Sequence, residues 1–290
     1  MKKVHRNIFL IVGFILLIAY SISFVTPLLW AFLTSFKTEI EFMLDKFSLP
    51  KSLNLQNYIT AYRTIRVPIV ENGVSRYVYA EEMLFNSVVY SVLSTIMHVA
   101  TPCITAYAVA RYNFRFGKLL YSIVIITMIL PIVGNLPSQI QVAKSLGFYD
   151  SFFGLAIMKG HFLGINFMIF YAAFKSIPKD YAEAADIDGA SQWKIFTKVM
   201  LPHVKTTISA VALLSFITFW NDYTTPMIFL PSKPTIAYGL YYFNQTTLTE
   251  ASFLTVRIAG SMLISIPILL VFIFMKDKLI GNINVGGLKG

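Results

Sequence analysis

Six long apolar runs divide this chain of 290 residues, and a membrane helix needs about 20 predominantly apolar residues. With 56% hydrophobic and only 13% charged residues, the chain has too few charges for the surface of an ordinary soluble domain. We therefore expect an all-α integral membrane protein. The six transmembrane helices are predicted at residues 8–36, 83–110, 119–140, 152–174, 206–223 and 258–275.

Two of these predicted spans have unusual features, one in its length and the other in its charge. The first is longer than the apolar region of about 7–15 residues in a signal peptide and lacks a small-residue cleavage site, so we expect it to be retained. The fourth contains Lys159 and His161, although a lysine in mid-membrane costs several kcal/mol. These side chains either lie near the outer headgroups and extend toward water, or line a polar pathway.

The Lys and Arg residues favour one orientation. Of the 24 in the chain, more fall on the side that holds the N-terminus, the loop 111–118, the segment 176–205 and the tail 276–290. Because positive residues accumulate in cytoplasmic loops, both termini are predicted to be cytoplasmic. The net charge of +10 then has a membrane explanation and does not require nucleic acid as a partner.

Two segments are predicted to lie outside the cell. Residues 37–82 carry balanced charges and are long enough for a small cap, in which we expect a strand or a short helix. Residues 224–256 form a second external loop, rich in proline and in the aromatic residues Tyr238, Tyr241 and Tyr242. Such aromatic residues suit either a protein contact or anchoring among lipid headgroups.

The chain shows no motif for catalysis or for nucleotide binding. It lacks G-x-x-x-x-G-K-[ST], H-E-x-x-H and C-x-x-C, and its one cysteine, Cys103, lies in a predicted span. The four histidines are scattered over different elements. We therefore predict no catalytic site, no metal site and no cofactor bound by this chain.

The segment "EAADIDGASQWKIFTKVMLP", from Glu183 to Pro202, is charged although apolar runs flank it. Gly189 permits a sharp bend between two short helices, the first supported by the pair Lys179 and Glu183. Pro202 is predicted to end the second helix.

In that second helix, Trp193, Phe196 and Met200 are spaced to form one apolar stripe. The segment is either an amphipathic connector on the inner headgroups or a protein-binding element. Four acidic residues between Asp180 and Asp188 favour a protein partner, because the cytoplasmic leaflet is itself negative.

The order of residues in this segment resembles the EAA loop of bacterial ABC-importer permease subunits. Val199 replaces the usual isoleucine. Further similarity to the carbohydrate (maltose-type) branch runs from the second span to the C-terminus. It includes "NS" at Asn86 and Ser87, "AYAVARYNF" from Ala106, "ILP" from Ile129, "WND" at Trp220–Asp222 and the closing "GGLKG".

This resemblance implies a type I ABC-importer permease fold and a set of site residues. ATP and Mg²⁺ would be bound by partner ATPase subunits. The loop 224–256 would act as a scoop that enters an extracellular binding protein, although direct stacking of a sugar on its tyrosines is an alternative. The implied residues are Glu183, Ala184, Ala185, Asp188, Gly189, Ala190, Leu201 and Pro202 for ATPase coupling; Gly286, Gly287 and Lys289 for a tail contact with the ATPase; Tyr238, Gly239 at the tip, Tyr241 and Tyr242 for the binding protein; and Trp220, Asn221 and Asp222 for a possible pathway.

The resemblance thus predicts a permease subunit of an ATP-driven importer of a sugar or oligosaccharide in the bacterial cell membrane. Its partners would be a second homologous permease, two ABC ATPase subunits and the binding protein. A permease for another class of solute is an alternative. A secondary transporter is a third interpretation, but the chain does not show the two related halves that such transporters often have.

Overall fold

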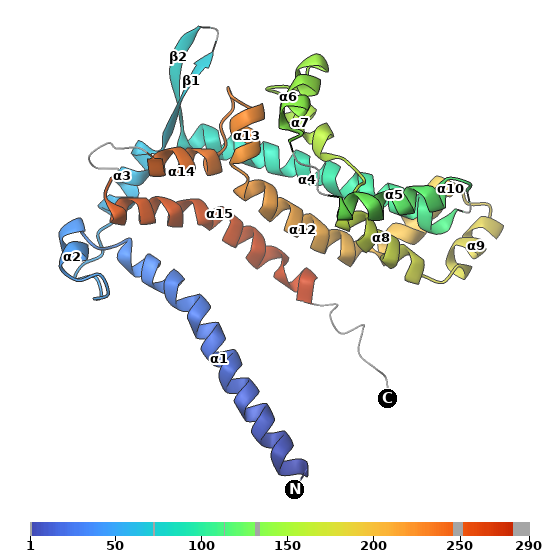
Figure 1. The fold of residues 1–290 in the computed structure, drawn as a ribbon, viewed down its shortest axis with the longest axis horizontal. Helices are drawn as coiled ribbons and strands as arrows, with labels where there is room; N and C mark the ends of the chain where they lie inside the picture. Colours follow the sequence, from blue (N-terminus) through green and yellow to red (C-terminus); the bar gives the residue numbers. More distant parts are fainter. Residues whose placement is uncertain (1, 72, 113, 131–133, 246–251, 281–290) are drawn as a thin grey trace. The chain divides into compact units, whose positions relative to one another are not determined.

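The computed structural model describes residues 2–71, 73–112, 114–130, 134–245 and 252–280. The regular secondary structure of these residues is helical apart from one two-stranded hairpin (Figure 1). It is therefore predominantly α-helical, as predicted. Internal packing divides it into two units, one made of Met1–Val67 with Leu240–Ile266 and the other of Pro68–Gly239 with Pro267–Gly290.

The first unit begins with helix α1 (Lys2–Thr34). Its apolar stretch Leu10–Thr34 is long and apolar enough to cross a membrane. Large side chains along this stretch are exposed on every face; Phe14, for example, is 65% exposed. A helix that is apolar all round needs lipid or another apolar surface around it, so α1 fits the predicted first span.

Polar contacts fold the segment after α1 back on itself. Helix α2 (Glu39–Leu44) starts with a capping box, in which Thr38 and Glu41 each accept a hydrogen bond from the other's backbone N–H. Lys37 is buried, and its ammonium donates to the backbone oxygen of Asp45 at 3.0 Å. This lysine therefore stabilises the turn through a buried hydrogen bond.

Helix α3 (Gln56–Thr64) is attached to the end of α1 by an amide side chain. Asn57 is buried, and its Nδ2 donates to the backbone oxygens of Ser35 at 2.8 Å and Lys37 at 2.7 Å. These bonds satisfy carbonyl groups that the end of a helix would otherwise leave without partners.

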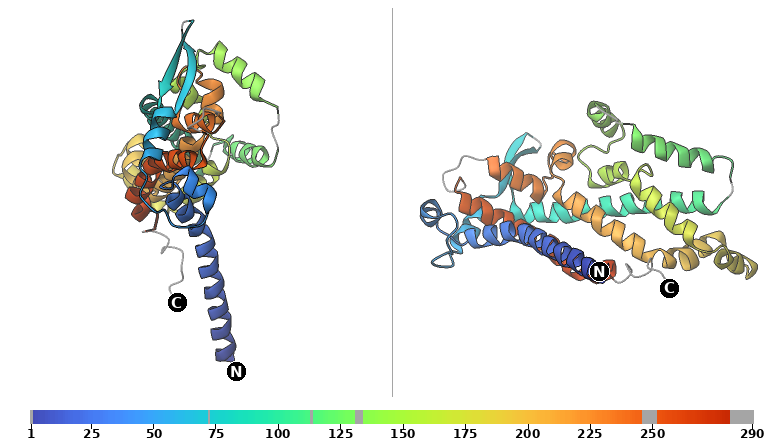
Figure 2. Two further views of the ribbon diagram at one scale, coloured as in Figure 1. Left: turned by 90° about the vertical axis from the view of Figure 1, so that its left-hand side faces the viewer. Right: turned by 60° about the horizontal axis from the view of Figure 1, so that its bottom comes forward.

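Helix α4 (Ala80–Arg111) is the centre of the second unit, and several helices of that unit pack against it. Figure 2 shows its course among the other helices of this unit. The helices packed most extensively on α4 are α7 (Phe152–Lys159), α8 (Ile165–Ser176) and α12 (Lys205–Asn221).

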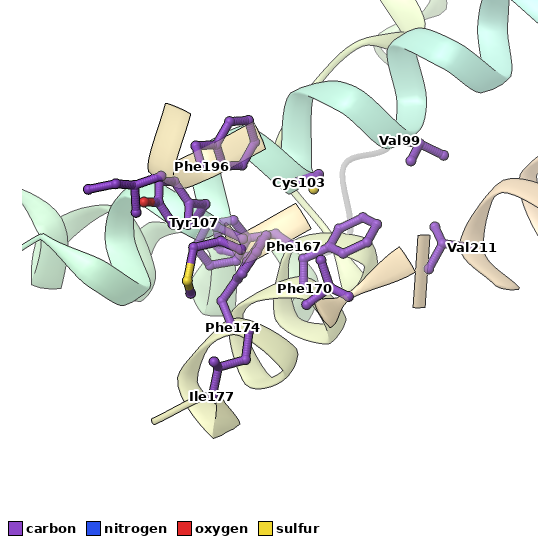
Figure 3. Close-up of a cluster of buried hydrophobic side chains, with 14 residues drawn as sticks. Val99, Cys103, Tyr107, Phe167, Phe170, Phe174, Ile177, Phe196 and Val211 are labelled. Carbon is purple, nitrogen blue, oxygen red and sulfur yellow. The ribbon is translucent and has the colours of Figure 1, made fainter. Parts of the chain in front are cut away.

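Aromatic side chains fill the core between α4 and α8 (Figure 3). Phe167, Phe170 and Phe174 are fully buried, and their spacing places them on one face of α8. The ring of Tyr107 on α4 lies with its centroid 5.2 Å from that of Phe174 and 4.6 Å from that of Phe196. Such aromatic pairs add about 0.5–1.5 kcal/mol beyond the burial of their area.

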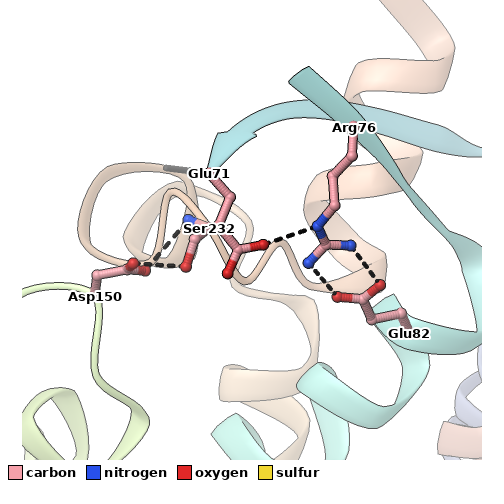
Figure 4. Close-up of polar contacts among 5 residues, drawn as sticks. All are labelled: Glu71, Arg76, Glu82, Asp150 and Ser232. Atoms are coloured by element: carbon pink, nitrogen blue, oxygen red, sulfur yellow. Dashed lines mark hydrogen bonds and ion pairs between the residues drawn. The ribbon is translucent and has the colours of Figure 1, made fainter. Parts of the chain in front are cut away.

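Hydrogen bonds join two connections of the second unit (Figure 4). Asp150 precedes α7 and adopts a left-handed φ of 58°. Its carboxylate accepts hydrogen bonds from the backbone N–H and the hydroxyl of Ser232, at 3.2 and 2.6 Å, and its backbone oxygen accepts one from Lys233. Asp150 thus fixes the connection before α7 to the one after α13 (Thr224–Phe229).

The first turn of α7 has no room for a side chain at Gly154. A Cβ there would lie 2.4 Å from the Cα of Phe148, a backbone atom that no rotamer change can move. We expect Gly154→Ala to lower stability by about 1–3 kcal/mol or more, as overpacking does. The thermal unfolding midpoint of the purified protein measures this. Gly13→Ala is the control, because nothing lies within 4 Å of its Cβ position; equal midpoints for the two variants would contradict the prediction.

The predicted external segment contains short helices and a hairpin, in agreement with the expectation of a strand or short helix. Strands β1 (Arg66–Glu71) and β2 (Val74–Tyr79) form the hairpin. Figure 4 shows Arg76 of β2 bound to Glu82 and to Glu71, each with N–O distances of 2.9 Å. The hydrogen bonds that the Arg76 guanidinium donates to Glu82, and then to Glu71, raise the pKa of Arg76 above its usual value.

The third predicted span is not one helix. Helix α5 (Gly117–Ile129) ends eleven residues earlier than expected and α6 (Leu136–Ser145) follows it. Leu130 is extended, with ψ of 120°, because the next residue is Pro131 and a proline disfavours the helical conformation of the residue before it.

The fourth predicted span is also broken, into α7 and α8. Between them, Gly164 has a φ of 117°, which residues with a Cβ rarely adopt. The helices α1, α4, α12 and α15 (Leu254–Ile280) overlap the other four predicted spans. In the described residues, only Leu10–Thr34, Ala80–Arg111 and Leu254–Phe274 are single helices long and apolar enough to span a membrane.

Candidate functional site

The segment predicted to couple to an ATPase is two helices joined by a tight turn. Helix α9 (Asp180–Ile187) ends just before Gly189, whose φ of 76° confirms the predicted bend. Helix α10 (Gln192–Lys194) then starts with a cap, in which the Ser191 hydroxyl accepts a hydrogen bond from the Lys194 N–H at 3.3 Å. The turn and the cap set the direction in which the second helix leaves.

The side chains of the predicted apolar stripe differ in burial. Phe196 and Met200 are buried, whereas Trp193 is 68% exposed, and Ile195, which is not part of the predicted stripe, is buried as well. The cause is η1 (Ile195–Met200), a stretch of π-helix that follows α10. Its wider turn changes the spacing from which the stripe was predicted.

Pro202 does not end this helix. It is the second residue of α11 (Leu201–His203), which continues directly from η1, so the helical stretch runs one residue beyond it. The chain bends by 75° just afterwards, between the helical stretch Gln192–His203 and α12.

One side of the coupling segment is exposed and the other is packed. Glu183, Ala184, Asp188, Gly189 and Pro202 are exposed, whereas Ala185, Ala190 and Leu201 pack against the aromatic core. In the described part of the chain, the Glu183 carboxylate has no hydrogen bond or ion pair with another side chain. This acidic group is therefore available to a partner.

Two residues at the end of α4 hold the coupling segment, and sequence reasoning did not single them out. Arg111 donates from Nη2 to the backbone oxygen of Ile177 at 2.8 Å. Tyr112 donates to the side-chain oxygen of Gln192 at 2.8 Å, and Gln192 also donates to Asp186 at 3.0 Å. The available signal was the stretch "AYAVARYNF", which places an arginine and a tyrosine directly after an apolar helix.

Replacing Gly189 tests the turn. No atom lies within 4 Å of its Cβ position, so the effect of a side chain there comes from the backbone alone. We expect Gly189→Val to destabilise the turn by about 1–2 kcal/mol and to speed amide hydrogen exchange over residues 180–194. Gly189→Asn is the control, since asparagine tolerates this conformation. Identical exchange in the two variants would argue against a required left-handed turn.

A second polar cluster surrounds Asp222 of the predicted pathway. Its carboxylate accepts hydrogen bonds from the Tyr90 hydroxyl at 2.9 Å and the Thr225 N–H at 3.0 Å. The Lys159 ammonium lies 3.9 Å from the same carboxylate and donates to the Thr225 hydroxyl at 3.2 Å. Lys159 thus has protein partners, and its side chain remains partly exposed.

The other two predicted pathway residues differ from Asp222. Trp220 is buried, and its indole N–H has no hydrogen-bond partner among the described residues. Asn221 is exposed and donates to the backbone oxygen of Ile217 at 2.9 Å. A cavity of about 290 Å³ adjoins the Asp222 cluster. Its lining residues are Gln139, Leu155, Met158, Lys159, His161, Thr225 and Phe229.

The predicted scoop is a helix. Residues expected to form a loop with Gly239 at its tip belong to α14 (Ile236–Gln245), and Gly239 is a buried residue whose N–H donates to the oxygen of Thr235 at 2.8 Å. The tip assignment was therefore wrong. The prolines that suggested a loop lie before α14 or inside the short helix α13, so they do not interrupt it. Of the predicted contact residues, Tyr241 and Tyr242 are 39% and 38% exposed.

The start of α14 is anchored to α4 by the pair "NS". Asn86 is buried and donates to the backbone oxygen of Pro234 at 3.0 Å. The buried Ser87 hydroxyl accepts a hydrogen bond from the Ile236 N–H at 2.8 Å. Asn86 and Ser87 therefore fix the start of α14 to α4, a structural role that their position in the sequence did not reveal.

The remaining predicted site residues are in the tail. Gly286, Gly287 and Lys289 lie outside the described residues. Within the described residues, no group of three His, Cys, Asp or Glu side chains is placed to hold a metal ion.

The chain is similar to sugar-transport permeases of several bacteria. It is 26% identical over 274 residues to the diacetylchitobiose uptake system permease protein NgcG of Streptomyces coelicolor, covering 93% of this chain and 86% of the relative. It is 28% identical to the probable starch degradation products transport system permease protein AmyC of Thermoanaerobacterium thermosulfurigenes, over the full length of both chains.

Solved structures show the same fold. A chain from the crystal structure of a bacterial ABC transporter involved in the import of the acidic polysaccharide alginate matches with a TM-score of 0.74 at 22% identity, covering 93% of this chain and 96% of that one. A chain of the bacterial alginate ABC transporter in complex with an alginate pentasaccharide-bound periplasmic protein matches with a TM-score of 0.60 at 14% identity, covering 99% of both.

The sequence pattern of one family extends over most of the chain. The pattern described as the binding-protein-dependent transport system inner membrane component matches residues 99–279. This stretch contains the coupling segment, Asp222 with its partners Lys159 and Thr225, and α14. The chain therefore belongs to the family of binding-protein-dependent transport system inner membrane components and is a multi-pass protein of the cell membrane.

Proposed function

We propose that this chain is one permease subunit of an ATP-driven importer that takes up a sugar or oligosaccharide delivered by an extracellular binding protein. The observation that carries the proposal is the coupling segment: its acidic outer side is exposed at Glu183, and its inner side packs into the core around α4. Relatives of nearly the same length that transport diacetylchitobiose or starch degradation products support a carbohydrate as the solute.

The energy would come from two ATPase subunits that bind ATP and Mg²⁺, because this chain has no phosphate-binding motif of its own. Glu183, Ala184, Asp188 and Gly189 present the exposed surface that such a subunit would hold. The cytoplasmic tail with Gly286, Gly287 and Lys289 would add to that contact. A homologous permease would complete the membrane part of the complex.

Helix α4 is suited to carry movement of the coupling segment to the Asp222 cluster. At its C-terminal end it holds the segment through Arg111 and Tyr112. Farther along, Tyr90 binds Asp222, and Asn86 binds the start of α14. ATP and a loaded binding protein would then favour one state of the transporter by their differential affinities for it.

The proposed membrane arrangement keeps six spans with both termini in the cytoplasm. It places the coupling segment inside the cell and α14 outside. Asp222 and the adjoining polar cavity then lie between them, where Gln139, His161 and Thr225 offer the donors and acceptors that a hydroxyl-rich solute needs.

The exposed tyrosines of α14 are proposed to contact the binding protein. We expect Tyr241→Ala/Tyr242→Ala to slow release of the solute from the binding protein by about tenfold, because buried tyrosines at interfaces commonly contribute more than 1 kcal/mol. Binding-protein affinity for free solute should not change. If the tyrosines instead stack directly on sugar in the transporter, release would be normal and uptake alone would fall.

Reconstitution of the complete complex in vesicles tests the proposed function. Uptake should require ATP, the ATPase subunits and the loaded binding protein together. Uptake driven by an ion gradient without the ATPase would indicate a secondary transporter. ATP-dependent uptake of a solute other than a carbohydrate, without uptake of any sugar, would support the ATP-driven mechanism and contradict a carbohydrate as the solute.

A further inference from the structure

A second cavity, of about 790 Å³, lies beside the connection between α4 and α5. Three cationic side chains line it, those of Arg115, Lys118 and Lys175, and none forms an ion pair in the part of the chain that the structure describes. The volume is within the range of about 300–1,000 Å³ for small-molecule sites. Three like charges around one cavity attract an anion.

The rest of the lining suits a phosphate group. Tyr112, Tyr121, Ser122 and Tyr171 also line the cavity. The hydroxyl groups of Tyr121 and Tyr171 can donate hydrogen bonds to a ligand, whereas those of Tyr112 and Ser122 already donate to Gln192 and to the backbone oxygen of Lys118. Helix α5 begins at Gly117, also in the lining, and has no acidic residue in its first turn. The positive end of this helix therefore adds to the charge of the three cations.

An apolar stripe on α5 indicates what the phosphate is attached to. Leu119, Ile123 and Ile126 are 55%, 37% and 52% exposed, and their spacing places them along one side of α5. Lys118 and Ser122 of the cavity lining directly precede Leu119 and Ile123, so they lie on the adjacent side of the same helix. A ligand with an anionic head and long apolar chains matches both features.

We propose that this cavity binds the phosphate headgroup of an anionic phospholipid, with its acyl chains along the apolar stripe of α5. Clusters of cations at the cytoplasmic end of membrane helices attract anionic lipids, and the proposed orientation puts the cavity at that end. The cavity adjoins the coupling segment, because Tyr112 of its lining also donates to Gln192.

Native mass spectrometry of the purified complex measures the proposed binding, with dioleoyl phosphatidylglycerol as the probe and dioleoyl phosphatidylcholine as the neutral reference. We expect Arg115→Gln/Lys118→Gln/Lys175→Gln to weaken phosphatidylglycerol binding about tenfold or more and to leave phosphatidylcholine unchanged. The matched control Lys2→Gln/Lys3→Gln/Arg6→Gln removes the same charge near the N-terminus. The single change Lys118→Glu tests the site with less risk to folding and should also weaken binding.

Three results would overturn the proposal. Equal losses in the cavity variant and the control would show general electrostatic attraction. Displacement of the lipid by glycerol 3-phosphate at similar concentration would show a site for a soluble phosphate. A wild-type complex that binds phosphatidylglycerol no better than phosphatidylcholine would show that the cavity takes no anionic lipid. Lipid binding is measured without transport, so these results do not depend on the proposed transport function. A complex that fails to transport a sugar can still bind phosphatidylglycerol, and the two failures are therefore distinguishable.

Discussion

Glu183→Ala should reduce ATP-coupled uptake by about ten- to a hundredfold. The Glu183 carboxylate is exposed and has no partner among the described side chains, so the substitution should leave the fold intact. What it would remove is the proposed charge-assisted hydrogen bond to a basic residue of the ATPase, and such bonds contribute about 1.5–3 kcal/mol. The measurement is solute taken up per ATP hydrolysed in reconstituted vesicles, together with stimulation of hydrolysis by the binding protein.

The matched control for Glu183→Ala is Asp180→Ala. Asp180 is an exposed acid on the same helix, three residues away, so it controls for the loss of a negative charge near the start of α9. Its effect on uptake should be small. Wild-type uptake in Glu183→Ala, or equal losses in the two variants, would contradict the assignment of Glu183 as the specific coupling contact.

The sequence was sufficient for the bend and the exposed acids of the coupling segment because these features are local. The left-handed turn at Gly189 depends on one residue type, and the exposed acids follow from charge. The π-helix of η1 was not predictable in the same way. No short-range signal marks it, so the spacing of a regular helix did not identify Ile195 as a buried residue beside Phe196.

The broken spans show where apolar composition misleads. Residues 119–140 and 152–174 are apolar enough to suggest one helix each, but Pro131 and Gly164 separate them into two. The opposite error occurred at α14, where prolines and a glycine suggested a loop although the segment is helical. Gly73, with a φ of 79°, marks the hairpin turn, and the Asn-Gly pair there could have predicted it.

The Asp222 cluster could not be predicted because its members are far apart in the chain. Tyr90 and Asp222 are separated by 132 residues, and Lys159 and Thr225 by 66. Only the packing of α7 and α12 on α4 brings these groups together. The sequence signal was the lysine itself, since a cation in an apolar run requires a partner or a route to water.

Asp222→Ala should produce the largest loss of stability among the substitutions considered, about 3 kcal/mol or more. It leaves the ammonium of Lys159 without its carboxylate and the hydroxyl of the fully buried Tyr90 without its acceptor. Removing one partner of such a pair costs more than replacing both, because a charge is then left without compensation. The thermal unfolding midpoint of the purified complex measures the loss.

A double-mutant cycle separates the contribution of the ion pair between Lys159 and Asp222 from other causes of the stability loss. Lys159→Met/Asp222→Ala should be more stable than Asp222→Ala alone, since the double variant has no isolated ammonium group. The matched control is Asn221→Ala: this neighbouring residue is exposed, and its substitution should change stability by no more than about 0.5 kcal/mol. Additive effects of the two single substitutions would mean that Lys159 and Asp222 do not interact, and the cluster would then have to be stabilised by Tyr90 and Thr225 alone.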